Sequence, residues 1–163
     1  MLKLTSVLLI TLLSAFAGNE AHAIKFSNQF AEFELPAKWN CNLEGAEWVC
    51  QSTDDKKRRD AIVVLAAKLK GDLDSLDRYQ QYLQAPRSFA SPNGQTVKSN
   101  PVYTKVNTIN GQQWVDSLHM ESEVPGFYTR YLVTIKQDIA ILVTYSINKG
   151  KYQEYLPQFD EMA

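Results

Sequence analysis

Turn signals divide residues 102–147 into four strand-length runs, and this pattern constrains the possible folds more than any other feature of the chain. The dipeptide Asn110-Gly111 separates the first two runs and is a strong signal for a two-residue hairpin turn. The resulting register places Lys105 opposite Asp116, and a pair of opposite charges supports that pairing. The pattern therefore predicts an antiparallel meander, with strands at Val102 to Ile109, Gln112 to Glu123, Phe127 to Lys136 and Ile139 to Ile147.

Two further segments upstream are predicted to be strands. Residues 30–35 alternate between two sets of side chains and end at Pro36, which cannot continue a ladder. Residues 60–68 contain a continuous apolar run instead of an alternation, which is typical of a strand covered on both faces. This second strand favours a sheet with helices on either side.

Two other segments have helical spacing. Their apolar residues recur every three or four positions; they are Leu73, Leu76, Tyr79, Tyr82 and Leu83 in the first segment and Tyr152, Tyr155, Leu156, Phe159 and Met162 in the second. We expect Asp72 or Asp74 to cap the first helix and Pro86 to end it.

The order of these elements predicts an α+β fold. We expect an α/β/α sandwich whose central antiparallel sheet, of about six to seven strands, carries the 74–85 helix and the C-terminal helix on opposite faces. The alternative is a curved sheet with both helices on one side, as in cystatin-like folds. Exposure of Ile62 to Leu65 on one face of the sheet would favour that alternative.

The N-terminus has the three parts of a secretory signal peptide. Lys3 precedes an apolar run, and the small residues of Ala21-His22-Ala23 follow it. We expect cleavage after Ala23, so that Ile24 begins a mature chain with a single domain over residues 24–163. The later apolar stretches are too short to span a membrane. The sequence therefore predicts a periplasmic or secreted protein without a transmembrane segment.

The two cysteines, Cys41 and Cys50, are expected to form a disulfide. Export places them in an oxidising compartment, where such a pair closes. A two-residue turn at Gly45-Ala46, with glycine first, would place the two cysteines directly opposite each other in a hairpin. Because the spacing is not the C-x-x-C of redox proteins, we expect a structural bridge.

The charge pattern argues against nucleic acid as a partner. The formal net charge is -1, so the chain has no overall field to attract a polyanion. The one basic run, residues 56–59, is enclosed by Asp54, Asp55 and Asp60, and is therefore expected to be a solvated loop.

Residues 86–101 are the longest stretch rich in turn residues, and we expect a long loop there. Long loops in compact domains often bind partners. The tentative binding residues are Arg87, Phe89 and Asn93, which offer a cation, an aromatic ring and a hydrogen-bonding group. The alternative is a plain surface loop.

A second, weaker candidate binding site lies on the meander at His119, Glu121 and Arg130. His119 is the only histidine of the predicted mature chain. Ser117, His119 and Glu121 share one face of a strand, but neighbours two apart are too distant for a nucleophile and its base. We therefore expect no catalytic residues, no metal site and no cofactor, and we expect Arg130 to be a cross-strand partner of Glu121 or His119.

Two short strings, Phe-Glu-Leu-Pro-Ala-Lys-Trp at residues 33–39 and Ile-Asn-Gly-Gln-Gln-Trp at residues 109–114, together with the order of elements, resemble the PsbP-like α/β/α sandwich superfamily. The resemblance implies an accessory or binding protein without a catalytic site, as in photosystem assembly, Ran GTPase binding and bacterial envelopes. We therefore expect a non-enzymatic envelope protein that binds a protein partner. The alternatives are a secreted enzyme with an unrecognised site and a secreted inhibitor or effector.

Overall fold

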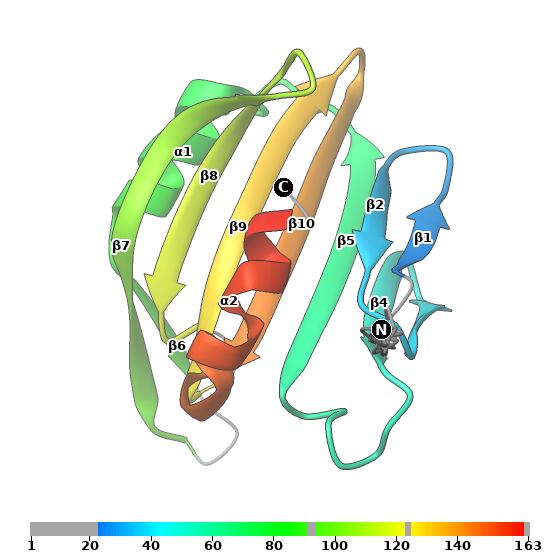
Figure 1. Cartoon of the computed structure of the whole chain (residues 1–163). Helices are drawn as coiled ribbons and strands as arrows, with labels where there is room; N and C mark the ends of the chain where they lie inside the picture. Colours follow the sequence, from blue (N-terminus) through cyan, green and yellow to red (C-terminus); the bar gives the residue numbers. More distant parts are fainter. Residues whose placement is uncertain (1–22, 91–93, 123–124, 162–163) are drawn as a thin grey trace, which may run out of the picture.

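A computed structural model describes residues 23–90, 94–122 and 125–161, the side chains of residues 158–161 excepted. The predicted signal peptide before Ala23, and Asn93, lie outside the described residues. Strands dominate the described part of the chain (Figure 1). They are β1 Ile24–Ser27, β2 Glu32–Leu35, β3 Trp39–Glu44, β4 Glu47–Ser52, β5 Ala61–Leu69, β6 Arg87–Ala90, β7 Thr96–Ile109, β8 Gln112–Met120, β9 Phe127–Lys136 and β10 Ile139–Asn148; the helices are α1 Leu76–Gln84, the 3-10 turn η1 Lys149–Lys151 and α2 Tyr152–Glu161.

Eight of the strands form one antiparallel sheet in the order β3-β4-β5-β10-β9-β8-β7-β6. The predicted meander is present, and Lys105 pairs with Asp116 as expected. The prediction of six to seven strands is wrong, because both strands of the cysteine hairpin join the sheet and β6 adds an eighth strand at the edge. The expected long loop is also wrong, because residues 87–90 and 96–99 pair as an edge hairpin.

The remaining strands, β1 and β2, form a separate two-stranded ribbon. The Asn28 carboxamide oxygen accepts from the backbone N–H groups of Phe30 and Ala31, at 2.8 and 2.9 Å, and so shapes the turn between them. The ribbon packs on the cysteine hairpin through Phe26, whose ring lies 5.4 Å from that of Trp48. Strand β1 was not predicted, and it begins at Ile24, the first residue of the predicted mature chain.

The cysteine hairpin is formed as predicted. Cys41 and Cys50 are paired residues of β3 and β4, and a disulfide joins them across a Cα–Cα distance of 4.0 Å. Gly45 has a φ of 64°, a conformation that costs glycine little and other residues more. The turn that the sequence predicts therefore sets the register of the bridge.

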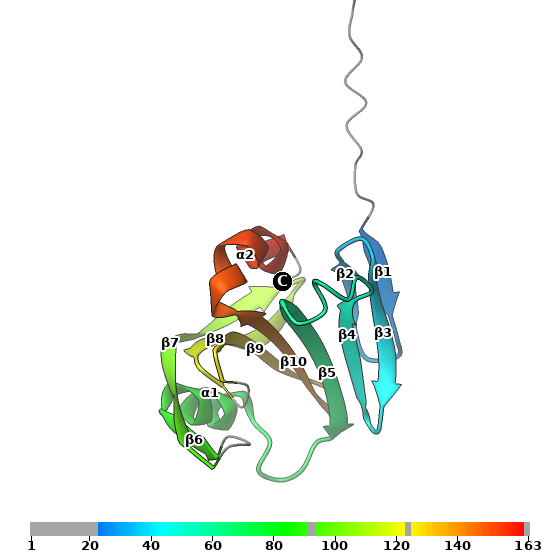
Figure 2. The ribbon, with the colours of Figure 1, turned by 90° about the horizontal axis from the view of Figure 1, so that it is seen from below.

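The two helices pack against different groups of core residues. Helix α1 contacts β7, β8 and β9, and its Leu83 packs with Val115, Tyr131 and Val133. Tyr155 of α2 belongs to the larger core that continues under the ribbon. Seen from below, α2 and α1 lie above and below the sheet (Figure 2). Each helix is short, so much of the face that carries α2 is covered by the ribbon instead.

Strand β5 is buried in alternation rather than uniformly. Val63 and Leu65 are buried under the ribbon side, whereas Ile62 and Val64 are half-buried on the other side. Strand β5 was expected to be covered on both faces, but it is fully covered on one face and only partly on the other.

The first helix has a different cap from the one predicted. Ser75 is the N-cap, and its hydroxyl accepts from the Arg78 N–H at 3.2 Å. Asp74 instead accepts from the Gly71 N–H and from the Tyr79 hydroxyl. The bond from Tyr79, with further bonds from Lys68 and Gly71, holds the pKa of Asp74 well below its ordinary value. None of the helices in the described part of the chain is long and apolar enough to cross a membrane.

Candidate binding cleft

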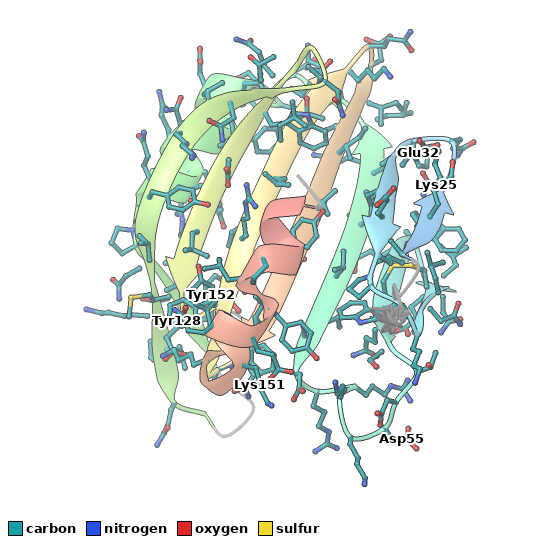
Figure 3. The ribbon with its side chains drawn as sticks, in the orientation of Figure 1. Lys25, Glu32, Asp55, Tyr128, Lys151 and Tyr152 are labelled. Atoms are coloured by element: carbon teal, nitrogen blue, oxygen red, sulfur yellow. A yellow bond between two sulfur atoms is a disulfide. The ribbon has the colours of Figure 1, made fainter. Side chains whose placement is uncertain are left out.

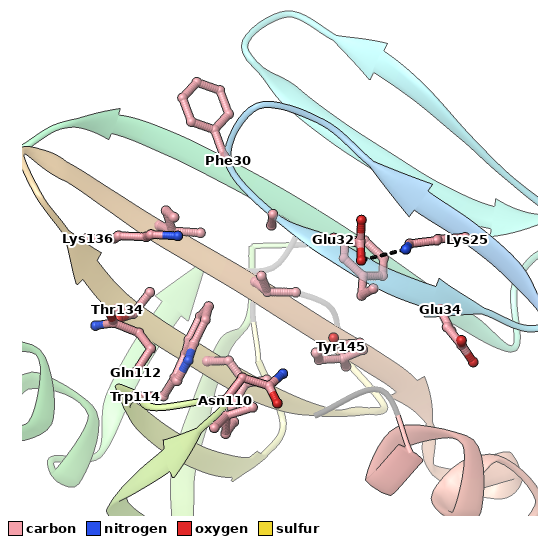
Figure 4. Close-up of a pocket in the computed structure, with 16 residues that line it drawn as sticks. Lys25, Phe30, Glu32, Glu34, Asn110, Gln112, Trp114, Thr134, Lys136 and Tyr145 are labelled. Carbon is pink, nitrogen blue, oxygen red and sulfur yellow. Dashed lines mark hydrogen bonds and ion pairs between the residues drawn. The ribbon is translucent and has the colours of Figure 1, made fainter.

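A cleft of about 400 Å³ opens between the β1–β2 ribbon and the sheet, on the face that carries α2 (Figure 4). Its floor is apolar and comes from three neighbouring strands of the sheet: Trp114 of β8, Leu132 of β9, and Ile141, Val143 and Tyr145 of β10. This volume lies within the range of ordinary ligand sites in proteins, which combine an apolar lining with a few polar groups.

Polar groups surround the floor. The Lys25 ammonium and the Glu32 carboxylate, both well exposed, form an ion pair at 2.7 Å across the ribbon (Figure 3). On the sheet side, the Gln112 side chain donates to the Thr134 hydroxyl at 2.8 Å and to a backbone carbonyl of β9. These bonds hold one wall of the cleft in place.

The cleft also has an electrostatic direction. Lys136, at the end of β9, and Glu34, near the end of β2, both line it. They stand at opposite ends of the cleft, with Lys136 towards Phe30 (Figure 4). Lys25, which stands opposite Glu34 in the ribbon, also lines the cleft but forms the ion pair with Glu32. A ligand in the cleft would therefore meet a positive group at one end and a net negative charge at the other.

The predicted binding residues near the edge lie far along the sheet from this cleft. The Arg87 guanidinium donates to the Tyr82 carbonyl, at 2.8 Å through Nη2, and stacks 3.5 Å over the Tyr82 ring. Phe89 pairs with Val97 inside the edge hairpin. Arg87 therefore fastens β6 to α1, and Asn93 lies outside the described residues.

His119 is buried, with 1% of its surface exposed, and it serves as a structural link. Its Nε2 lies 2.9 Å from the Leu83 carbonyl oxygen, and its Nδ1 lies 2.7 Å from the Ser99 hydroxyl. Because a carbonyl only accepts, Nε2 carries a proton, and in the neutral ring Nδ1 then accepts from Ser99. His119 thus ties the end of α1 to β8 and β7.

Ser117 is equally closed. Its hydroxyl is 2.7 Å from the Thr104 hydroxyl and donates to the Tyr103 carbonyl at 3.0 Å. Both Ser117 and His119 are buried. The pair is arranged to hold α1 and β7 on the sheet.

Arg130 does not pair as predicted. It stands opposite Leu118 in the register of β8 and β9, and its side chain therefore lies on the other face from His119. There the guanidinium binds the Asp116 carboxylate through two bonds, at 3.0 and 2.9 Å. Burial, together with the charge of Asp116, raises the pKa of Tyr103, a further partner of this carboxylate, to about 12.

Glu121 lies at the corner after β8, where it accepts from the Lys149 ammonium and from the Gly126 N–H. These bonds hold the pKa of Glu121 below its ordinary value. His119, Glu121 and Arg130 thus belong to three separate interactions and form no cluster. No group of three or more His, Cys, Asp or Glu side chains in the described ranges is placed to hold a metal ion.

The architecture can be compared with solved structures. The solution structure of cyanobacterial PsbP (CyanoP) from Synechocystis sp. matches with a TM-score of 0.56, over 93% of this chain and 95% of that chain, at 13% identity. The chain has a PsbP-like fold. At this identity the likeness concerns the fold alone. A Bacteroides thetaiotaomicron crystal structure matches with a TM-score of only 0.40, at 10% identity, over 73% of this chain and 38% of that chain.

No family model and no curated protein matches the chain. The cleft residues are therefore assigned from the geometry of this chain alone. Sequence reasoning missed them because Trp114, Ile141 and Val143 have the pattern of ordinary core residues. One signal was available: Ile24 and Phe26 alternate with polar residues, which indicates the strand that completes the ribbon.

Proposed function

We propose that the chain is an exported, non-enzymatic binding protein of the cell envelope, an accessory protein built on an α/β/α sandwich, and that the cleft holds its ligand. The observation that carries the proposal is the cleft, which combines an apolar floor of strand residues with charged groups at both ends. Such a hollow suits binding. Ser117 and His119, the nucleophilic and basic side chains of β8, are engaged in structural hydrogen bonds away from the cleft.

Two features support export. The first residues have the pattern of a cleavable signal peptide. The disulfide between Cys41 and Cys50 belongs to a type that persists in oxidising compartments. A secreted enzyme or an inhibitor remains an alternative, but no specific arrangement in the described residues favours either.

Export and cleavage of the signal peptide are tested by the intact mass of the protein recovered from the envelope fraction and the medium. The expected mass is that of residues 24–163 with two hydrogens fewer, because the signal peptide is removed and the bridge is closed. A full-length chain would contradict export by this route, and a mass with both thiols would contradict the oxidising compartment.

The binding site is tested by photo-crosslinking in the native envelope. A photoreactive phenylalanine analogue replaces Asn110, an exposed residue at the rim of the cleft, and in the control it replaces Tyr82, an exposed residue of α1. We expect an adduct of defined mass from position 110 and none of that mass from position 82. The change Trp114→Ala should remove the adduct, because it removes the largest side chain of the floor. Equal adducts from both positions, or none from 110, would contradict the proposal.

A further inference from the structure

We propose that the ligand of the cleft is an extended segment of a partner protein, which adds as a third strand to the free edge of β2. This inference rests on the proposed binding function and names the class of ligand. Its starting point is the ribbon, in which β2 pairs with β1 and, among the described residues, with no other strand. A free strand edge is a template for another chain.

The cleft follows this edge. Every residue of the segment 30–34 lines it. Side chains alternate between the two faces of a strand, so the exposed Glu32 and Glu34 lie on one face of the ribbon and the buried Phe33 on the other. A hollow that touches side chains from both faces of one strand runs along the edge of that strand.

Backbone N–H and C=O groups on the free edge of β2 point towards the cleft. The Asn28 N–H donates to the Ala31 carbonyl at 3.0 Å, which marks this pair as hydrogen-bonded. Bonded and non-bonded pairs alternate along an antiparallel ladder, so Glu32 and Glu34 fall in the non-bonded pairs with β1. Their N–H and C=O groups therefore point away from β1 and are available to a third strand.

The floor gives the incoming strand a side-chain pattern. Alternate residues of a strand that pairs with β2 would face the sheet, where they meet Trp114, Ile141 and Val143. The residues between them would face solvent. A segment with apolar residues at every second position fits both requirements.

The charged ends give the strand a direction. An antiparallel strand, the more stable arrangement, would start beside Glu34 and finish near Phe30, where Lys136 stands (Figure 4). A basic residue at the start and an acidic residue at the end of the segment would then each meet the opposite charge. The expected ligand is therefore a short strand that begins with a cation, alternates apolar residues and ends with an anion.

The first test uses three synthetic peptides and the mature chain. The first peptide is Lys-Val-Thr-Val-Thr-Val-Glu. In the second peptide the lysine and the glutamate are exchanged. The third peptide has the sequence of the first but carries N-methyl groups on the residues whose backbone N–H groups would point towards β2. We expect the first to bind, the second to bind several-fold more weakly, and the third to bind at least tenfold more weakly because its donors are blocked. Absence of binding by the first peptide at millimolar concentration, or equal binding by the first and third, overturns the proposal.

Amide hydrogen exchange locates the contact. Saturation with the first peptide should slow exchange at Glu32 and Glu34, whose N–H groups become bonded. Exchange at Phe33, whose N–H is already bonded to β1, should stay unchanged. Protection that appears only at sheet residues would contradict pairing with β2.

The variants separate the edge from the rest of the cleft. Glu34→Pro removes a donor on the free edge without removing a bond to β1, and should weaken the first peptide about tenfold. The matched control, Ser27→Pro, changes the equivalent position on the outer edge of β1 and should leave binding unchanged. Glu34→Gln keeps the donor and should weaken binding only a few-fold, through the lost charge.

Two further outcomes distinguish failure of this inference from failure of the proposed function. If Trp114→Ala removes the envelope crosslink but Glu34→Pro does not, the cleft binds a ligand that does not pair with β2. If light scattering shows a dimer that Glu34→Pro disperses, the strand comes from a second copy of this chain. Either result overturns the proposed partner segment. Equal crosslinking from positions 110 and 82, or none from position 110, would instead overturn the proposed binding function.

Discussion

The two faces of the eight-stranded sheet are completed in different ways. On the face of α1, buried polar side chains bind one another and the backbone, with His119 linking Leu83 to Ser99. On the opposite face the cover is divided between α2 and the β1–β2 ribbon, and the cleft lies along the ribbon (Figure 2). The first face is closed by hydrogen bonds, and the second is left partly open.

The residues with titratable or nucleophilic side chains and the residues that line the cleft therefore lie in different parts of the molecule. His119 and Ser117, the candidate base and nucleophile in the sequence, lie on the face that is closed by hydrogen bonds. The residues that look like plain core, such as Trp114 and Val143, line the open one. Changes of buried polar residues on either face should therefore alter stability, and changes at the cleft should alter binding.

The largest expected effect comes from Asp116, which is fully buried beneath the open face. Asp116→Ala leaves the Arg130 guanidinium without its bidentate partner in a poorly solvated place, and should lower the free energy of unfolding by about 3–5 kcal/mol. Urea denaturation measures the change. The control is Glu32→Ala, which breaks the exposed pair with Lys25 and should change stability by less than about 1 kcal/mol. Equal effects of the two changes would contradict the structural importance of the buried pair.

The disulfide stabilises the face that carries the cleft, since its hairpin supports the ribbon through Trp48. The double change Cys41→Ala and Cys50→Ala should lower the free energy of unfolding by roughly 2.5–3 kcal/mol, the loop-entropy value for a ring of this size. Thermal unfolding of the oxidised, reduced and double-variant proteins measures it. A reduced protein as stable as the oxidised one would show that the ribbon is anchored by other contacts.

His119→Leu tests the closed face directly. It leaves the Ser99 hydroxyl unpaired and removes one of the two donors to the Leu83 carbonyl, and should lower the free energy of unfolding by about 2 kcal/mol. Crosslinking from position 110 should persist at a temperature where the variant is folded. Loss of the crosslink with unchanged stability would show that His119 acts in binding rather than in stability.

Local sequence patterns predicted much of the fold. The Asn110-Gly111 turn and the Gly45-Ala46 turn set the registers of two hairpins, because glycine accepts the backbone conformation that each requires. Strand β6 was not predicted because Pro86 and residues 92–94 are typical of a loop. Pairing with β7 instead determines the conformation of Arg87 to Ala90.

The candidate site was not predictable in the same way. Alternation shows that Ile141 and Val143 face inwards, but not that the ribbon leaves a hollow above them. That depends on the distance between segments far apart in the chain, which no local pattern contains. The partner of Arg130 was also mispredicted, because a shift of one residue in register moves a side chain to the other face.

The smallest expected effect concerns Glu121, which joins the corner after β8 to Lys149. Because the folded protein holds the pKa of this carboxyl below its ordinary value of 4.5, the ion pair contributes stability above the unfolded pKa and loses it as the pH falls through the folded pKa. Glu121→Gln should therefore lower the free energy of unfolding by at most about 1 kcal/mol near neutral pH, since the pair is partly exposed. The difference between the variant and the parent should shrink below pH 4.5. Urea titrations at a series of pH values measure it, and salt should reduce the neutral-pH difference by screening. A difference that grows on acidification would mean that Glu121 acts as a neutral hydrogen-bonding group rather than as a charge.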